Sequence, residues 1–227
     1  MKRSLVLLCL LCACPDIAPI EDAKTMGAVV TIKDWFTSCY LLKAGERVAL
    51  FDSCWREGAL KAGLAQHGVT PDQVTHVFMT HGHSDHVGGL GLVPQAKVLA
   101  LRSEQPNLTI NGGPAGAIEE SLLDGQEIRF GDHTIRVLAV PGHTPGSAVY
   151  WVDGVVLLGD TGRVNKAGQI ISEEGFSEDP TQAAASLADL AVRLQRERLR
   201  VDWLVPAHTG AVQGIQPLLD FAAAHTP

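Results

Sequence analysis

The feature that most constrains the fold is a histidine-rich segment that directly follows an apolar stretch. Residues 80–86 read Thr-His-Gly-His-Ser-Asp-His, and residues 74–79 before them are typical of a buried strand. Three of the chain's nine histidines and one aspartate therefore fall in one tight loop. Imidazole and carboxylate groups bind zinc and similar divalent ions, and their spacing allows several to converge on one ion. A solvated polar loop would not be expected to place three histidines and an aspartate within six residues. The sequence therefore predicts a metal site at the end of this strand.

Three further strand ends carry residues of the same chemical types. His143 lies in the turn 140–146, Asp160 ends the apolar run 155–159, and His208 follows the apolar run that ends at residue 206. Singly, each would more often be an ordinary loop residue. Loops at strand ends on a rigid scaffold carry function, and together with the first cluster they supply five histidines and two aspartates. That set is sufficient for two metal ions with positions left for water and substrate.

The periodicity of the chain predicts two rounds of strands followed by helix. A helix start is clearest at Asp179, an N-cap residue followed by proline. We expect strands at 28–32, 39–43, 48–52, 74–79, 97–101, 127–130, 134–140, 148–152, 155–158 and 200–205, and helices at 57–67, 180–196 and 215–224. No internal repeat or linker interrupts 25–227. This pattern predicts a single α/β domain with two packed sheets and helices outside.

The ordered pattern of these residues resembles the metallo-β-lactamase superfamily over about residues 28–212. It consists of His81-x-His83-x-Asp85-His86, then His143, Asp160 and His208. The resemblance implies an αββα four-layer sandwich with the site along one edge. It implies one metal held by His81, His83 and His143, a second held by Asp85, His86 and His208, and Asp160 bridging the two. It also implies that Asp52, at a strand end, supports the histidine loop without binding metal.

The same resemblance implies a metal-dependent hydrolase. Two divalent ions, zinc first with iron or manganese as alternatives, would share a hydroxide that attacks the substrate, with Asp85 orienting it and accepting its proton. True β-lactamases of this pattern carry cysteine or serine where Asp160 stands, so the aspartate resembles the glyoxalase II and lactonase branches. The expected substrate is a small molecule with an ester, lactone or thioester bond. Only a short segment follows His208, which argues against glutathione thioesters.

Two loops are expected to shape the substrate cleft. Residues 33–37 carry two aromatic side chains, and residues 162–178 include Phe176. An apolar cleft beside metal ions favours a partly hydrophobic substrate. The remaining histidines lack partners at ligand spacing and are expected to be structural; these are His67, His76, His133 and His225.

Two other functions remain open at this level. A mononuclear-iron persulfide dioxygenase has the same histidine motif but would leave His86 and His208 without a metal. A non-catalytic binding protein on the same fold is the second alternative, and the complete ligand set argues against it.

The N-terminus is expected to direct export. Residues 1–3 are basic, residues 5–13 are apolar, and the stretch is shorter than the roughly 20 residues of a membrane-spanning helix. Residues 11–14 resemble a bacterial lipobox, so we expect a signal peptide at 1–13, a lipid anchor on Cys14, a tether at 14–27 and the metallo-β-lactamase-like domain at 28–227. An ordinary cleaved signal peptide is the alternative. The predicted location is the cell envelope or periplasm, with membrane contact only through the lipid.

Charge and cysteine content add two expectations. The net charge of −7 argues against a nucleic-acid partner. Cys39 and Cys54 are the cysteines left in the predicted domain. An oxidising compartment would permit a bond between them, and the sequence does not decide it, but the simpler expectation is two buried free thiols. The oligomeric state is not predicted.

Overall fold

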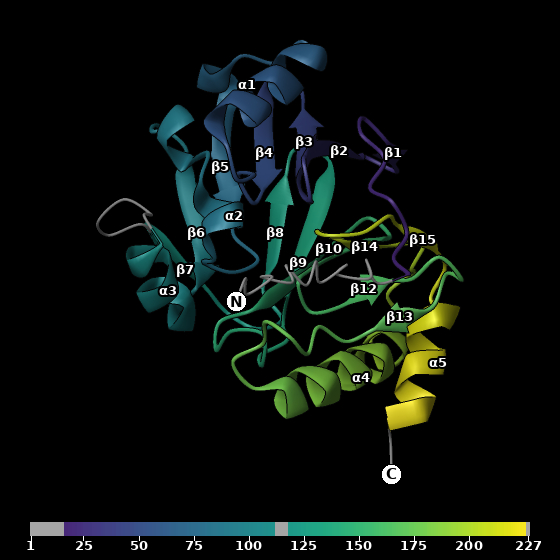
Figure 1. Ribbon diagram of the computed structural model, residues 1–227. Coiled ribbons are helices and arrows are strands. Elements are labelled where there is room, and N and C mark those ends of the chain that lie inside the picture. Colours follow the sequence, from purple (N-terminus) through teal and green to yellow (C-terminus); the bar gives the residue numbers. More distant parts are fainter. Residues whose placement is uncertain (1–15, 112–117, 226–227) are drawn as a thin grey trace, which may run out of the picture.

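The computed structural model describes residues 16–111 and 118–225, and its layers are visible in Figure 1. The first sheet has the strand order β1-β2-β3-β4-β5-β6-β7 and the second β15-β14-β11-β10-β9-β8. The first contains β1 (Thr25–Met26), β2 (Val29–Asp34), β3 (Thr37–Ala44), β4 (Arg47–Phe51), β5 (Val74–Phe78), β6 (Lys97–Leu101) and β7 (Glu120–Leu122). The second contains β8 (Glu127–Phe130), β9 (His133–Ala139), β10 (Ala148–Val152), β11 (Val155–Gly159), β14 (Trp203–Pro206) and β15 (Val212–Gln213). A short ribbon joins β12 (Arg163–Val164) to β13 (Ile170–Ile171).

Helices cover the outer faces of both sheets. They are α1 (Glu57–Gln66), α2 (Ser84–Val87), α3 (Gln105–Ile110), α4 (Pro180–Arg196) and α5 (Gln216–His225), with 3₁₀ turns at Pro71–Gln73, Leu90–Leu92 and Arg102–Glu104. In Figure 1, α1 lies on one side of the molecule and α4 and α5 lie on the other. The Asp179 carboxylate accepts a hydrogen bond from Gln182 N at 2.9 Å, which confirms the N-cap predicted for α4.

Alternation along the strands builds the layers, because successive side chains of a strand point to opposite faces. On β3, Leu41 packs toward α1 with Leu60, whereas the adjacent Leu42 faces the second sheet. Leu42 belongs to the core between the two sheets, together with residues such as Val137 and Leu157. A third core lies under α4 and α5. The predicted αββα sandwich is confirmed.

Parallel pairing gathers the ends of several strands at one edge. β4, β5 and β6 are mutually parallel neighbours, and β11 and β14 are also parallel. β9 and β11 both run antiparallel to β10, so they emerge on the same side. The loops that carry His81, His143, Asp160 and His208 follow these ends. The topology thereby brings together segments that lie far apart in the sequence.

The sequence did not predict the shortest strands. β1, β12, β13 and β15 have two residues each and β7 has three, which is too little for a period-2 pattern to stand out. The main strands and the three long helices fall within a few residues of their predicted bounds.

The described part of the predicted tether lies against the domain. Ala18 N donates to Val164 O at 2.9 Å, Gly210 N donates to Ala18 O at 2.8 Å, and Met26 is buried in the core between the sheets. The signal peptide and Cys14 lie outside the described residues. None of the helices in the described ranges is long and apolar enough to cross a membrane.

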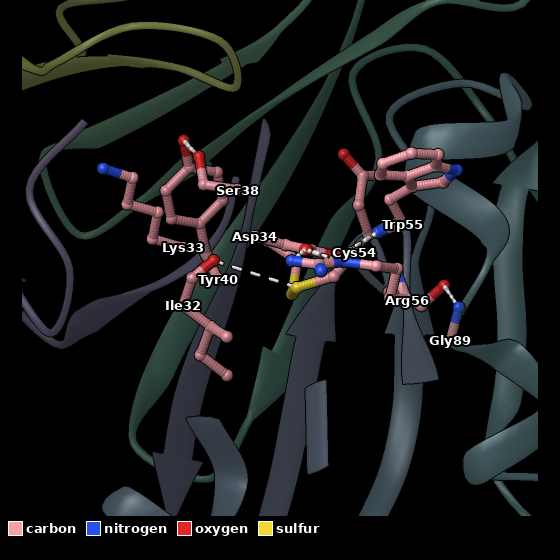
Figure 2. The surroundings of a disulfide bond; sticks show 12 residues. Ile32, Lys33, Asp34, Ser38, Tyr40, Cys54, Trp55, Arg56 and Gly89 are labelled. Carbon is pink, nitrogen blue, oxygen red and sulfur yellow. Dashed lines mark hydrogen bonds and ion pairs between the residues drawn. A yellow bond between two sulfur atoms is a disulfide. The ribbon is translucent and has the colours of Figure 1, made fainter. Parts of the chain in front are cut away.

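Cys39 and Cys54 form a disulfide, so the expectation of two free thiols is wrong. Cys39 lies on β3, and Cys54 follows β4 in a turn where Asp52 and Cys54 have φ near +60°. This turn brings the two Cα atoms to 4.9 Å, within the range that a disulfide needs. Strand spacing in the sequence does not reveal such a turn. Figure 2 shows the bond beside Asp34, Trp55 and Arg56.

Candidate metal centre

The first ligand group consists of His81, His83, His143 and Asp160. His81 Nε2 lies 3.1 Å from His83 Nδ1, and His143 Nε2 lies 3.2 and 3.0 Å from those two atoms. Three ring nitrogens this close converge on one point. All three predicted ligands of the first metal therefore come together, from the ends of β5 and β9.

The second group consists of Asp85, His86 and His208. His208 Nε2 lies 3.2 Å from Asp85 Oδ2, and His86 Nε2 lies 3.7 Å from the same oxygen. Asp85 and His86 come from α2, and His208 comes from the loop after β14. The structure thus brings together the second predicted set as well.

Asp160 faces both groups. Its Oδ1 lies 3.2 Å from His86 Nε2, and its Oδ2 lies 2.9 Å from His208 Nε2. The same Oδ2 is 3.6 Å from His143 Nε2 and 3.8 Å from His81 Nε2. A carboxylate in this place can contribute to two ions at once, which is the role that the resemblance implies for Asp160.

The donor set fits metal ions. Two of its atoms, His86 Nε2 and Asp160 Oδ1, are buried and face each other at 3.2 Å, and within the described residues neither of them forms a hydrogen bond. Buried polar atoms are normally paired, and unpaired ones call for a specific explanation. Imidazole nitrogen with carboxylate oxygen suits zinc and related divalent ions, which would satisfy both atoms.

Outer contacts fix the orientation of two ligand rings. Asp52 Oδ2 accepts from His86 Nδ1 at 2.8 Å, and Asp52 also accepts from Thr80 N and Thr80 Oγ1 at 2.8 Å. The carbonyl of Phe36 accepts from His208 Nδ1 at 2.9 Å. When Nδ1 donates, Nε2 is left with its lone pair toward the centre. Asp52 occupies the supporting place expected from the sequence.

Charge is distributed unevenly in the metal-free site. Burial would raise the pKa of the Asp160 carboxyl, but His86, His208 and His81 hold it well below its usual value. Burial lowers the pKa of His143 to about 4 and that of His81 well below its usual value, so both rings are neutral. Burial also acts to lower the pKa of His208, but Asp160 and Asp85 outweigh it and raise it to about 9. The second group therefore holds protons that the first group does not.

A pocket of about 560 Å³ opens onto both groups. It is lined by Phe36, Trp55, His83, Ser84, Asp85, Asn111, His143, Asp160, Arg163, Phe176 and His208. Phe36 and Phe176 come from the two loops expected to shape the cleft. Trp35 does not line this pocket; it is 67% exposed and stacks on Trp55 at 5.7 Å.

Trp55 and Arg163 line the pocket although the sequence did not predict either as a site residue. Asp34 positions Trp55, because its carboxylate accepts from Trp55 N at 3.0 Å and from Arg56 N at 2.7 Å. Arg163 is ion-paired with the buried Glu173 and is the one lysine or arginine among the described residues that line this pocket. Trp55 lies in neither of the two loops expected to shape the cleft, and Arg163 lies in the expected loop 162–178 but carried no signal of its own. The four histidines expected to be structural belong to neither ligand group of the described chain.

Comparison with known proteins shows the family of the chain. The family model described as "Metallo-beta-lactamase superfamily" matches residues 32–208. The chain belongs to this superfamily, as the motif order predicted.

Two curated relatives illustrate the range of the family. Human metallo-beta-lactamase domain-containing protein 1 is 37% identical over 159 residues, which cover 68% of this chain and 54% of the human protein. A hydroxyacylglutathione hydrolase of Anaeromyxobacter dehalogenans (strain 2CP-C) is 39% identical over 131 residues, which cover 57% of this chain and 46% of that protein. The chain spans about half the length of the curated relatives it matches.

Solved structures agree on the fold. A subclass B3 metallo-beta-lactamase of Bradyrhizobium japonicum superposes with a TM-score of 0.68 at 17% identity and covers 93% of each chain. A flavo di-iron protein from Thermotoga maritima gives 0.64 at 21% identity and covers 83% of this chain and 52% of that chain. At these identities the likeness concerns the fold alone.

Proposed function

We propose that the chain hydrolyses a small ester, lactone or thioester at a site that holds two divalent ions, zinc first. The observation that carries this proposal is the position of Asp160 between two complete ligand groups. Divalent ions bound there would activate water at neutral pH and polarise the scissile carbonyl group. A single-iron persulfide dioxygenase would leave the second group unused, and that group is complete and partly buried.

Asp85 is the residue that we assign to proton transfer. It lines the pocket, and its side chain is 18% exposed. Burial acts to raise its pKa, but the hydrogen bond from His208 and the nearby His86 hold it below its usual value. An ionised carboxylate at the pocket wall can orient a water molecule and accept its proton.

The pocket wall supports a partly apolar substrate. Phe36, Trp55 and Phe176 line it, and Phe176 is 72% exposed. Aromatic surface of this kind favours apolar acyl or alcohol groups. Arg163 adds one cationic group, which favours a substrate that also carries an anion.

The proposed location is the cell envelope, with the chain exported and anchored through Cys14. The Cys39–Cys54 disulfide supports export, because disulfides persist in oxidising compartments. Replacing Cys14 with alanine should release the protein from the membrane fraction; unchanged fractionation would remove the lipid anchor from the proposal.

Metal content and turnover test the function together. The chain without residues 1–14 should bind about two equivalents of zinc. Asp160→Asn and His83→Ala should bind less and lose hydrolysis of esters, lactones or thioesters. One equivalent of iron that Asp160→Asn leaves unchanged would favour the dioxygenase. Turnover of phosphodiesters alone would overturn the substrate class.

A further inference from the structure

A buried carboxylate outside both ligand groups joins the loops that form the first one. Glu104 follows β6 at the sheet edge where His81 emerges, and its side chain is fully buried. Its Oε1 accepts a hydrogen bond from Gly82 N at 2.8 Å. Its Oε2 accepts one from Thr144 Oγ1 at 2.7 Å. Gly82 lies between two ligands of the first group, and Thr144 is adjacent to the third.

The two loops belong to different sheets. The loop with His81 and His83 follows β5 of the first sheet, and the loop with His143 follows β9 of the second. The histidine nitrogens must meet across the gap between the sheets. A single carboxylate that accepts from both loops fixes their separation near the ligands.

The packing around Glu104 leaves little room for movement. A Cβ atom at Gly146 would lie 2.5 Å from both Glu104 N and Glu104 Oε2. A Cβ atom at Gly82 would lie 2.5 Å from Leu108 N, at the end of the same segment. Glycine on both ligand loops therefore permits the close approach of the 104–108 segment, which is inserted between them.

Glu104 differs from the other buried carboxylates. Asp34 pairs with Arg56, Asp52 with His86, and Glu173 with Arg163. In the described ranges, Glu104 forms no ion pair, and its hydrogen bonds come from one amide and one hydroxyl group. Burying a carboxylate without a cation is costly. Its two contacts connect this carboxylate specifically to the loops of the first ligand group.

We propose that Glu104 is a positioning residue for the first metal ion: by tying the His81–His83 loop to the His143 loop, it sets the affinity of that ion. The second group has other supports, Asp52 on His86 and the Phe36 carbonyl on His208. The role of Glu104 is therefore confined to one of the two ions. The inference rests on the metal site of the proposed function but not on any substrate.

Zinc titration of the metal-free chain tests this in two backgrounds. Asp85→Ala with His208→Ala isolates the first group, and His83→Ala with His143→Ala isolates the second. Glu104→Ala should weaken zinc binding about 10–100-fold in the first background, the usual cost of removing an outer contact of a ligand. It should leave zinc affinity unchanged in the second. The visible absorption of cobalt(II) in the first background should change as well, since it reports on ligand geometry.

Three variants keep the test decisive. Glu104→Gln retains the shape and can hydrogen-bond both loops, so it should restore most of the affinity. Thr144→Val removes the hydrogen bond from Thr144 Oγ1 to Glu104 and should lose part of the zinc affinity of the first group. This variant tests the proposal even if Glu104→Ala does not fold. Asp153→Ala is the control for loss of a carboxylate away from the site. Asp153 accepts a backbone N–H bond from Thr134 and pairs with His133, and it lies in the turn before β11, at the opposite end of that strand from Asp160.

Several results would overturn the positioning role. These are equal losses in both backgrounds, equal losses in Glu104→Gln and Glu104→Ala, losses matched by Asp153→Ala, or full affinity in Thr144→Val. These titrations contain no substrate. The zinc affinities therefore test the role of Glu104 even if the chain proves not to be a hydrolase.

Discussion

Phe36 contacts His208 in two ways: its ring stacks on the imidazole at 5.7 Å between centroids, and its carbonyl accepts the Nδ1 hydrogen bond at 2.9 Å. One residue of the turn between β2 and β3 thus forms part of the pocket wall and orients a ligand from the loop after β14. The two roles are separable, because the hydrogen bond uses the backbone and the stacking uses the side chain.

Phe36→Leu should therefore affect substrate binding more than metal binding. The variant keeps the carbonyl but loses the ring contacts with His208 and Trp55. Phe36 lines the pocket, and an aromatic contact between its ring and the substrate would contribute about 0.5–1.5 kcal/mol, so KM for an apolar ester should rise several-fold with kcat and zinc content nearly unchanged. Steady-state kinetics and elemental analysis measure both. Trp35→Leu is the control, since Trp35 stacks in the same cluster but does not line the site pocket; zinc loss in Phe36→Leu would contradict the separation.

The raised pKa of His208 predicts a pH-dependent affinity for the second ion. At pH 7 the metal-free ring is protonated, because its pKa is about 9, and a bound ion requires the neutral ring. Asp160 and Asp52 outweigh burial and also hold the pKa of His86 well above its usual value, so affinity should rise at least tenfold per pH unit toward pH 9. Calorimetry in buffers of different ionisation enthalpy should detect the released proton. His143, with a pKa of about 4, releases none in this range.

The raised pKa of His208 also affects the stability of the metal-free fold. The folded pKa of His208 lies above the ordinary value of 6.5. Its protonated ring therefore stabilises the metal-free fold fully below about pH 6.5, and this stabilisation is lost as the pH rises through about 9. The melting temperatures of the metal-free chain and of metal-free His208→Gln should depend differently on pH between about 6.5 and 9. Identical pH profiles would contradict the raised pKa of His208.

The sequence predicts the ligands better than it predicts their surroundings. His81, His143 and His208 could be identified because each follows an apolar strand and the residue types together suit metal ions. Glu104 and Arg163 could not, since single charged residues without a pattern acquire a role only through the fold. The Cys39–Cys54 bond depended on a turn with positive φ that spacing does not reveal. Two-residue strands such as β12 and β15 form through tertiary pairing and carry no periodicity of their own.

Loss of the disulfide should destabilise the fold without emptying the metal site. A cross-link over a sequence separation of 15 residues contributes about 3 kcal/mol in the chain-entropy treatment. Urea denaturation of the oxidised and reduced chain, and of Cys39→Ala with Cys54→Ala, should show a loss of about this size. Zinc content should stay unchanged, because neither sulfur belongs to a ligand group. Equal unfolding free energies in the two redox states would refute the contribution.

Arg163 should discriminate between anionic and neutral substrates. Glu173 holds its guanidinium at the pocket, and a hydrogen bond to a charged group contributes about 1.5–3 kcal/mol. Arg163→Met should therefore lower kcat/KM for an ester that carries a carboxylate about 10–100-fold. The matching neutral ester should be nearly unaffected. Lys166→Met is the control, since it removes a positive charge from the same loop at an exposed position paired with Asp16. Equal losses of kcat/KM for both esters would contradict this prediction, because recognition of an anion lowers kcat/KM only for the ester with the carboxylate. Such a result would indicate that Arg163 instead stabilises the loop.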